Sequence, residues 1–210
     1  MKFEELLKKA GELPCFSTRF LAAGENLSQV RLQLARWVKD GRLIKIHKGL
    51  YTLAEPYRKI KLELFFIANY LKAPSYISLQ SALSRHGLIP EFVPATTSIT
   101  TARPQLIVTP LGRFEYRHVS KHLFWGYQLL ELSENQRAFV ASPEKALLDL
   151  VYLTPHGGKE NFLRELRLQN LDRFSKNVLR QFSKKFGSPK IERTVKNIEI
   201  IIDEGEGIEL

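Results

Sequence analysis

The sequence predicts an α+β protein, with an N-terminal winged helix-turn-helix followed by a mixed α/β C-terminal domain that ends in helices. Three observations support this fold class. A hydrophobic share of 44% is enough for a packed core. Short helical patterns and a basic hairpin pattern occupy residues 1–55, and apolar residues recur at helical spacing after Lys159. Glu55–Pro56 interrupts the pattern, so we expect domains at 1–55 and 56–210.

The chain is strongly basic. It has 32 Lys and Arg against 22 Asp and Glu, which gives a formal charge of +10 and a pI near 9.7. Such an excess indicates an anionic partner, nucleic acid before a membrane surface. Cys15 is the only cysteine, which excludes an internal disulfide and a CxxC zinc site. The N-terminus does not read as a signal peptide and no apolar stretch is long enough to cross a bilayer, so we expect a soluble cytoplasmic protein.

Helical patterns follow one another at the start of the chain. Phe3–Ala10 forms the first helix. The hydroxyl groups at 17–18 cap a short second helix, which Gly24 ends. Ser28 caps a third helix, and Asp40–Gly41 ends it. Two short helices joined by a glycine-containing turn are typical of a helix-turn-helix.

The third helix has an apolar face and a polar face. At 100° per residue, the side chains expected to face the core are those of Val30, Leu34, Trp37 and Val38. The opposite side carries Gln29, Gln33 and Arg36, with Leu32 and Lys39 at its margin. Gln and Arg are the side chains that pair bidentately with adenine and guanine edges, so this polar face is suited to reading a DNA sequence.

A basic hairpin follows this helix directly. Strand patterns at 42–46 and 50–53 flank a turn at 47–49, and Lys45 and Lys48 lie where the tip can reach phosphate. A hairpin in this place is the wing of a winged helix. The candidate DNA-binding residues are Ser28, Gln29, Arg31, Gln33, Arg36, Lys45 and Lys48. The alternative is a small helical domain whose basic residues only keep it soluble.

The middle of the chain mixes helices and strands. We expect a buried helix at 62–71, a second helix that a serine within 74–83 caps and that closes at His86–Gly87, and a threonine-rich strand at 96–101. A hairpin is expected at 105–119. Ser142–Pro143 begins a further helix, with Ser as its cap and Pro at its first position.

Three helical patterns make up the last third, at 159–168, 172–186 and from Ser188–Pro189 onward. The basic residues on their outer faces are Arg164, Arg167, Arg173, Lys176, Arg180, Lys184 and Lys185. These bases form either a solvated face or a surface that contacts acidic protein or RNA. We expect the acidic tail at 203–206 to be frayed.

Several motifs occur in an order that resembles a known family. They are GRLIKIHKGLYTL, PSYISLQSALSRHGLIPE, the threonine-rich strand, TPLGRFEYRHV, LFWGY and SPEKALLDLVYL, spread between Ser17 and Leu153. Together they are similar to the antitoxin and transcriptional regulator of AbiE-type abortive-infection toxin–antitoxin systems. The resemblance implies a winged helix that binds inverted repeats in double-stranded promoter DNA and represses its own operon. It also implies a type IV antitoxin that counters a nucleotidyltransferase-like toxin, with direct contact between the two left open.

No catalytic, cofactor-binding or metal-binding residue is expected. We interpret Glu144, Lys145 and Asp149 as residues of a helix start, and His118 and His122 do not share a helical face. The sequence has no P-loop, GxGxxG, HExxH or GxSxG motif, so we expect a protein that is not an enzyme. The alternatives are a stand-alone winged-helix transcription factor that senses a small molecule through its C-terminal part, or a nucleic-acid-processing enzyme docked by the winged helix.

Overall fold

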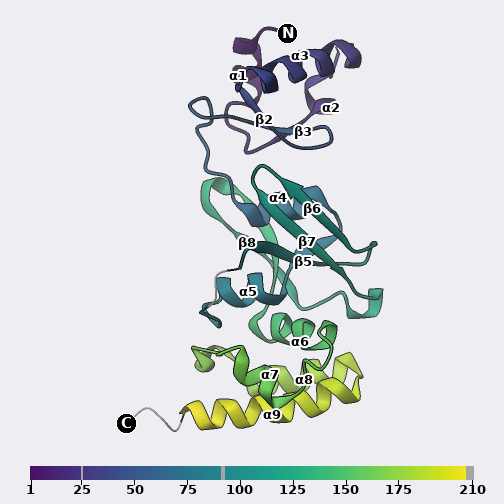
Figure 1. The fold of residues 1–210 in the computed structure, drawn as a ribbon, viewed down its shortest axis with the longest axis vertical. Helices are drawn as coiled ribbons and strands as arrows, with labels where there is room; N and C mark the ends of the chain where they lie inside the picture. Colours follow the sequence, from purple (N-terminus) through teal and green to yellow (C-terminus); the bar gives the residue numbers. More distant parts are fainter. Residues whose placement is uncertain (25, 91–92, 207–210) are drawn as a thin grey trace.

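The computed structural model describes residues 1–24, 26–90 and 93–206. An N-terminal lobe lies at one end of the molecule, a mixed sheet lies in the middle, and the C-terminal helices lie at the other end (Figure 1). This arrangement confirms the α+β prediction. Among the described residues, no helix has the length and apolar content needed to span a bilayer.

The N-terminal lobe packs three helices on a small antiparallel sheet of order β1-β3-β2. Its elements are α1 (Phe3–Ala10), β1 (Phe16–Ser17), α2 (Thr18–Leu21), α3 (Leu27–Lys39), β2 (Leu43–His47) and β3 (Leu50–Leu53). The helix-turn-helix order and the hairpin after α3 therefore occur as predicted. Lys48 lies in the hairpin turn, whereas Lys45 lies within β2 and not at the tip.

Two helix boundaries in this lobe differ from the prediction. Ser17 caps α2, because its Oγ accepts a hydrogen bond from the backbone N–H of Phe20 at 3.1 Å, but the helix ends at Leu21, before Gly24. The prediction that Ser28 caps α3 is wrong. Asn26 is the cap, since its Oδ1 accepts from the N–H groups of Ser28 at 3.0 Å and Gln29 at 3.3 Å.

The inner face of α3 is the predicted one. Val30, Leu34 and Trp37 are buried and Val38 is half-buried, in a cluster that also includes Leu6, Phe16, Tyr51 and Leu53. The exposed face of α3 is centred on different residues from those predicted. Leu32, expected at its margin, is 63% exposed, whereas Gln33 is half-buried. Gln33 therefore lies at the edge of the exposed surface and Leu32 on its crest.

A six-stranded mixed sheet of order β6-β7-β5-β4-β9-β8 forms the centre of the larger lobe. The β5–β7 and β4–β9 pairs are parallel and the other pairs are antiparallel. The strands are β4 (Ser75–Ile77), β5 (Ala95–Thr100), β6 (Gln105–Thr109), β7 (Gly112–His118), β8 (Tyr127–Glu131) and β9 (Arg137–Ala141). The threonine-rich strand and the β6–β7 hairpin confirm the prediction, whereas β4, β8 and β9 were not predicted.

Helices cover both faces of this sheet. They are α4 (Leu64–Leu71), α5 (Leu79–Arg85) and α6 (Pro143–Leu153). On one face, the hydroxyl of Tyr116 donates to the carbonyl oxygen of Ala68 in α4 at 2.7 Å. On the other face, the hydroxyl of Tyr76 donates to Asp149 in α6 at 2.9 Å. The prediction that the helix at 62–71 is buried is only partly right, because Tyr70 is 50% exposed.

Two caps in this lobe were predicted. Ser142 caps α6 as expected, with its Oγ accepting from the N–H of Lys145 at 3.3 Å. His86 ends α5, but its Nε2 lies 2.8 Å from the carbonyl oxygen of Ala141 in β9 and not from a carbonyl of its own helix. Glu91, which ends the motif that contains His86, lies outside the described residues.

The C-terminal layer contains α7 (Glu160–Glu165), α8 (Lys176–Phe186) and α9 (Pro189–Glu206). The helix expected from residue 172 begins only after Ser175, whose Oγ accepts from the N–H of Val178 at 3.4 Å. In α9 the predicted stripe of Ile191, Val195, Ile198 and Ile202 is buried. The acidic tail is not frayed at Asp203 and Glu204, because both belong to α9.

The lobes share apolar packing. The N-terminal cluster around Trp37 is one hydrophobic core, and a larger core fills the rest of the molecule. Three side chains of the N-terminal lobe, Cys15, Ile46 and Leu50, belong to the larger core. The hairpin β2–β3 therefore contributes to both cores, and the domain boundary at Glu55–Pro56 stays a prediction.

Candidate nucleic-acid interface

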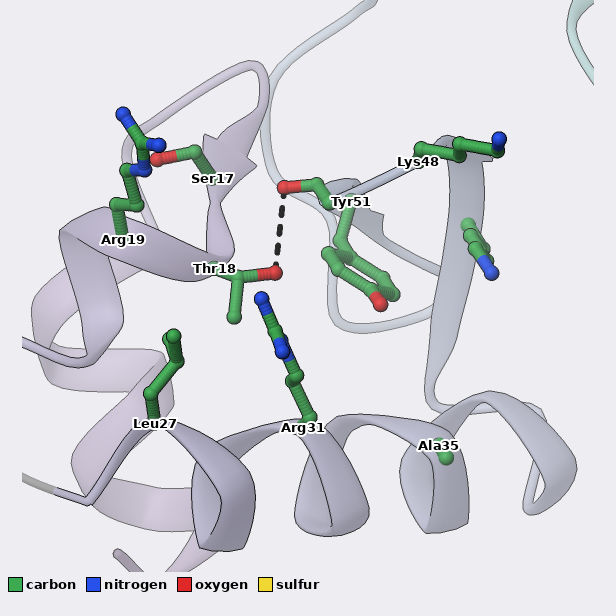
Figure 2. A pocket seen from close by; sticks show the side chains of 10 residues that line it. Ser17, Thr18, Arg19, Leu27, Arg31, Ala35, Lys48 and Tyr51 are labelled. Carbon is green, nitrogen blue, oxygen red and sulfur yellow. Dashed lines mark hydrogen bonds between the residues drawn. The ribbon is translucent and has the colours of Figure 1, made fainter.

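A groove of about 690 Å³ separates α3 from the hairpin β2–β3. The start of α2 closes one side of it (Figure 2). Its lining residues are Ser17, Thr18, Arg19, Leu27, Arg31, Ala35, Lys45, Lys48, Gly49 and Tyr51. The groove thus joins the three elements that a helix-turn-helix followed by a hairpin brings together.

Hydrogen bonds fix the hairpin turn against α2. The backbone N–H of Thr18 donates to the carbonyl oxygen of Gly49 at 2.8 Å, and its Oγ1 donates to the same atom at 3.4 Å. Gly49 has a φ of +71°, which favours glycine over residues with a side chain. At the far side of the sheet, the hydroxyl of Thr52 donates to the carbonyl oxygen of Pro14 at 2.8 Å. These bonds set where the turn and Lys48 lie relative to α3.

The groove is electropositive. Arg19, Arg31, Lys45 and Lys48 are exposed, and no lining residue is an Asp or Glu. Within the described part of the chain, none of the four forms an ion pair. Arg31 points from α3 into the groove toward Thr18 (Figure 2). Unpaired cations with no intervening carboxylate attract anionic ligands and raise their rate of association.

The predicted DNA-binding residues fall into two sets. Arg31, Lys45 and Lys48 line the groove. The other flank of α3 carries a second, smaller hollow of about 290 Å³, and the residues that line it are Met1, Gln29, Val30, Leu32, Gln33 and Arg36. Ser28 is exposed in the first turn of α3. The structure therefore separates the Gln29–Gln33–Arg36 face from the hairpin lysines by the crest of the helix.

Sequence reasoning missed part of the groove. Ser17, which caps α2, and Thr18 and Arg19 of α2 face the same space as Arg31. A signal for them exists, because Arg19 follows the cap of the helix that precedes α3, where a helix-turn-helix crosses the phosphate backbone. The predicted core position of Trp37 is confirmed, and the ring of Tyr51 is also buried.

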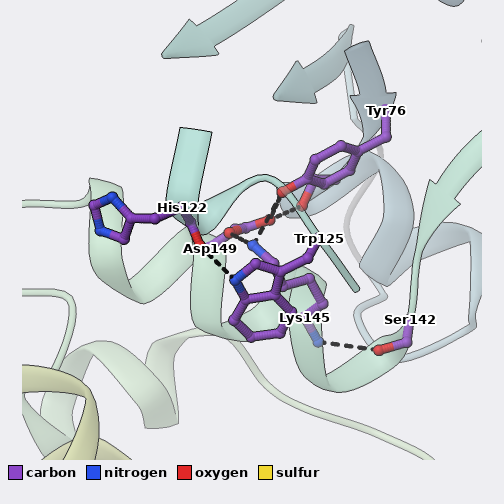
Figure 3. Close-up of polar contacts among 7 residues, drawn as sticks. Tyr76, His122, Trp125, Ser142, Lys145 and Asp149 are labelled. Atoms are coloured by element: carbon purple, nitrogen blue, oxygen red, sulfur yellow. Dashed lines mark hydrogen bonds and ion pairs between the residues drawn. The ribbon is translucent and has the colours of Figure 1, made fainter. Parts of the chain in front are cut away.

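Glu144 and Lys145 lie in the first turn of α6, as predicted, whereas Asp149 lies further along the helix and forms a buried ionic network with Lys145. The Lys145 ammonium forms an ion pair with Asp149, and both side chains are fully buried. Tyr76 and Ser78 donate to Oδ2 of Asp149 at 2.9 and 2.8 Å, and Nζ of Lys145 lies 3.0 Å from the Tyr76 hydroxyl (Figure 3). The interpretation as a helix-start residue is therefore wrong for Asp149, and for Lys145 it omits the buried ion pair.

Burial governs the titration of this network. Loss of hydration raises the pKa of Asp149, while Lys145, Ser78 and Tyr76 each act to lower it. The same burial lowers the pKa of Lys145 and raises that of Tyr76. The rings of Trp125 and Phe186 lie 4.9 and 4.8 Å from Nζ of Lys145. The network joins α6 to β4. Its side chains are buried, so a substrate in solution could not reach them.

Glu144 has a separate structural contact. It is 6% exposed, and its Oε1 accepts a hydrogen bond from the backbone N–H of Ser175 at 3.0 Å. His118 ends β7, and its Nδ1 lies 3.0 Å from the carbonyl oxygen of Ala102. His122 lies in the turn at Lys121–Leu123, so the two do not share a helical face. Within the described ranges, no group of three or more His, Cys, Asp or Glu side chains is arranged to hold a metal ion.

At least three of the seven bases on the outer face of the C-terminal helices form ion pairs within the chain. Arg164 pairs with Glu160 at 2.9 Å and with Glu204 at 3.1 Å, and Arg180 pairs with Glu199 at 2.6 Å. Lys176 also pairs with Asp203. The acidic end of α9 thus faces these bases, which weakens the alternative of a large acid-binding surface on this side.

Comparison with known proteins identifies a family at the N-terminus. A family model described as "Transcriptional regulator, AbiEi antitoxin" matches residues 4–54, about a quarter of the chain. No curated protein matches the chain. The matched segment contains α1 except for its first residue, together with α2, α3 and the hairpin that encloses the groove. Residues 4–54 are thus similar to the AbiEi antitoxin family of transcriptional regulators, which agrees with the resemblance that the motifs indicated.

Proposed function

We propose that the N-terminal lobe binds double-stranded DNA as a winged helix. In this mode α3 enters the major groove, which is wide enough for a helix, and the hairpin turn lies on the adjacent phosphate backbone. The observation that carries the proposal is the groove inside the matched segment, with four exposed cations and no carboxylate. Phosphate contacts of this kind supply affinity and set the register of the protein on DNA.

The residues on the two flanks of α3 have different roles in this proposal. On the hairpin side, Arg31 presents a guanidinium that can bond a guanine bidentately, and Lys45 and Lys48 present point charges to phosphate. On the other flank, Gln29 and Arg36 are exposed toward the second strand of the same major groove.

The remaining predicted residues have smaller parts. Ser28 and Gln33 lie at the start and at the edge of the exposed face. Leu32 on the crest of α3 is placed to contact a thymine methyl group. Base reading therefore rests on both flanks of α3, and phosphate contact on the hairpin and α2.

We infer further that DNA binding serves autorepression by a type IV antitoxin. The family description joins transcriptional regulation with an antitoxin role, and the inverted repeats of the operon's own promoter are the proposed operator. The functional partner is a nucleotidyltransferase-like toxin encoded beside it. Residues 1–55 carry DNA binding and residues 56–210 carry protection in this proposal, which places the protein at the nucleoid when it is bound.

The DNA proposal is tested with the full chain, a fragment from upstream of its own gene and a scrambled fragment, at several salt concentrations. Lys48→Ala should weaken binding to both DNAs alike and reduce the slope of log K against log salt by about 0.9, because one fewer counterion is released. Arg31→Ala should cost about 1–3 kcal/mol on the promoter and reduce discrimination between the two DNAs.

Lys121→Ala is the matched control, since Lys121 is exposed in the turn at Lys121–Leu123 of the larger lobe. If the two groove variants bind promoter DNA as tightly as this control, the groove is not the DNA interface. If Arg36→Ala alone abolishes discrimination, base reading belongs to the other flank of α3.

Point variants also test the division between the lobes. Deletion of residues 1–55 would strip Cys15, Ile46 and Leu50 from the larger core, so a failing fragment could simply be unfolded. The double variant Arg31→Ala/Lys48→Ala in the full chain avoids this problem, because both side chains are exposed. It should lose repression yet protect cells that express the toxin. Loss of protection by this folded variant would refute the division.

A further inference from the structure

A basic hollow in the C-terminal layer lies at the opposite end of the molecule from the groove between α3 and the hairpin. It has a volume of about 500 Å³ and is formed by the loop between α6 and α7 and the first turns of α9. The residues that line it are His156, Gly158, Lys159, Lys190, Arg193, Thr194 and Asn197. Its size falls within the range of small-molecule sites, which is about 300–1,000 Å³.

The lining is cationic and has no carboxylate. Lys159, Lys190 and Arg193 contribute three positive charges, and His156 adds an imidazole. Neighbouring bases on the same helical layer are neutralised by Glu160, Glu199, Asp203 and Glu204. Within the described part of the chain, the three cations of the hollow have no such partner. These four acids thus pair with bases outside the hollow, and no carboxylate of the described residues lines the hollow itself.

The loop that forms one wall is held in place by close packing. A Cβ atom at Gly158 would lie 2.4 Å from Oγ1 of Thr194, and one at Gly157 would lie 2.8 Å from the carbonyl oxygen of Val151. Only glycine permits this approach of the loop to α9 and α6. Asn197 also donates to the carbonyl oxygen of Gly158 at 3.5 Å. A ligand would therefore meet a wall that is already ordered.

Lys190 is fixed by the end of α6. Its ammonium donates to the carbonyl oxygens of Thr154 at 2.7 Å and Tyr152 at 3.3 Å, which leaves one N–H for a ligand. Partial burial removes water from the Lys190 ammonium and lowers its pKa. An anion beside this ammonium would replace the lost contacts with water. Arg193 uses Nε on the carbonyl oxygen of Pro189 at 3.2 Å, and its two terminal nitrogens stay available.

We propose that this hollow binds the phosphate groups of a small oligophosphate ligand, either free or as part of a nucleotide. Arg193 supplies a planar fork that matches phosphate oxygens, and Lys159 and Lys190 supply point charges. No Phe, Tyr or Trp lines the hollow, so a base would find no ring to stack on. Recognition therefore rests on the phosphates, and the rest of a nucleotide would extend into solvent.

The test is isothermal titration of the full chain with sodium tripolyphosphate, and with ATP in a second arm. Lys159→Ala/Arg193→Ala should weaken tripolyphosphate binding by about tenfold or more, because two charge-assisted contacts are lost. Both residues are exposed, so the melting temperature should stay unchanged. Lys121→Ala/Lys184→Ala removes two exposed charges away from the hollow and should bind as the parent chain does.

The groove variant Arg31→Ala/Lys48→Ala separates this site from the DNA interface and should also keep the affinity. Slower amide hydrogen exchange at 154–159 and 190–197 with ligand would place the ligand in the hollow. Equal binding of both ligands supports recognition through the phosphates alone, tighter binding of tripolyphosphate supports a free oligophosphate, and tighter binding of ATP supports a nucleotide whose nucleoside adds a contact at the rim of the hollow. Equal loss in the hollow variant and its charge-matched control, binding of ATP without tripolyphosphate, or no binding of either ligand would each overturn the proposal.

Discussion

Replacing Asp149 with Asn removes one charge from the buried ionic network and leaves the other. Asn can still accept hydrogen bonds from Tyr76 and Ser78, which lie 2.9 and 2.8 Å from the carboxylate, so the main change is the lost countercharge of Lys145. Removing one partner of a buried ion pair costs about 3–5 kcal/mol, because the remaining ion stays in a medium that solvates it poorly. The free energy of unfolding of a typical domain is about 5–15 kcal/mol, so this loss is a large part of it.

A double variant separates the charge from the packing. Lys145→Met/Asp149→Leu removes both ions, so neither is left buried alone, and its cost should be clearly smaller than the sum of the two single substitutions. Some cost remains, because the hydroxyl groups of Tyr76 and Ser78 lose their acceptor. Glu131→Gln is the matched control. The side chains of Glu131 and Arg137 are 78% and 59% exposed, so their ion pair contributes about 0–1 kcal/mol.

Urea unfolding of the full chain measures these differences, with far-UV circular dichroism and tryptophan fluorescence as probes. Trp125 lies beside Lys145 and reports on the larger lobe, whereas Trp37 lies in the core of the N-terminal lobe. Equal slopes of the free energy of unfolding against urea would show that the denatured states are comparable. If Asp149→Asn costs no more than Glu131→Gln, the network does not hold a buried charge and our account of it fails.

Two further predictions concern the N-terminal lobe. Asn26→Ala should lower the free energy of unfolding by about 1 kcal/mol, because Asn26 caps α3. Ser28→Ala should change it by less than about 0.5 kcal/mol. Urea unfolding measures both variants, and a larger loss in Ser28→Ala would mean that Ser28 is the cap. Burial raises the pKa of the Cys15 thiol to about 12, so little thiolate exists at pH 8 and a thiol reagent should label the native chain far more slowly than the unfolded chain. Labelling at equal rates in the two states would mean that Cys15 is not buried between the lobes.

Local sequence patterns predicted much of the secondary structure. The Ser142–Pro143 signal identified the start of α6, because the cap and the proline act on the backbone of the same turn. The same kind of signal failed at α3, where Asn26 and Ser28 are both good caps. The choice between them depends on which residue takes the extended backbone conformation, and Asn26 does so with a φ of −68° and a ψ of 116°.

Contacts between residues far apart in the chain determine features that local sequence patterns could not predict. Lys145 and Asp149 have the i, i+4 spacing of an exposed helical pair, and nothing in their own segment shows that they are buried. Their burial depends on Tyr76, which precedes Asp149 by 73 positions in the chain. Periodicity has the same limit in α3. It separated the inner face from the outer face, but it could not show that Arg31 and Ala35 lie on the flank of the helix that faces the hairpin.

The hairpin joins the candidate DNA interface to the larger lobe. Leu43, Tyr51 and Leu53 pack in the core of the N-terminal lobe, whereas Ile46 and Leu50 of the same two strands pack in the larger core. Lys48 lies in the turn between Ile46 and Leu50, only a few residues from each. Because packed cores resist deformation, the position of Lys48 relative to α3 depends on both cores at once. The hairpin is therefore the element through which a change in the larger lobe would reach DNA contact.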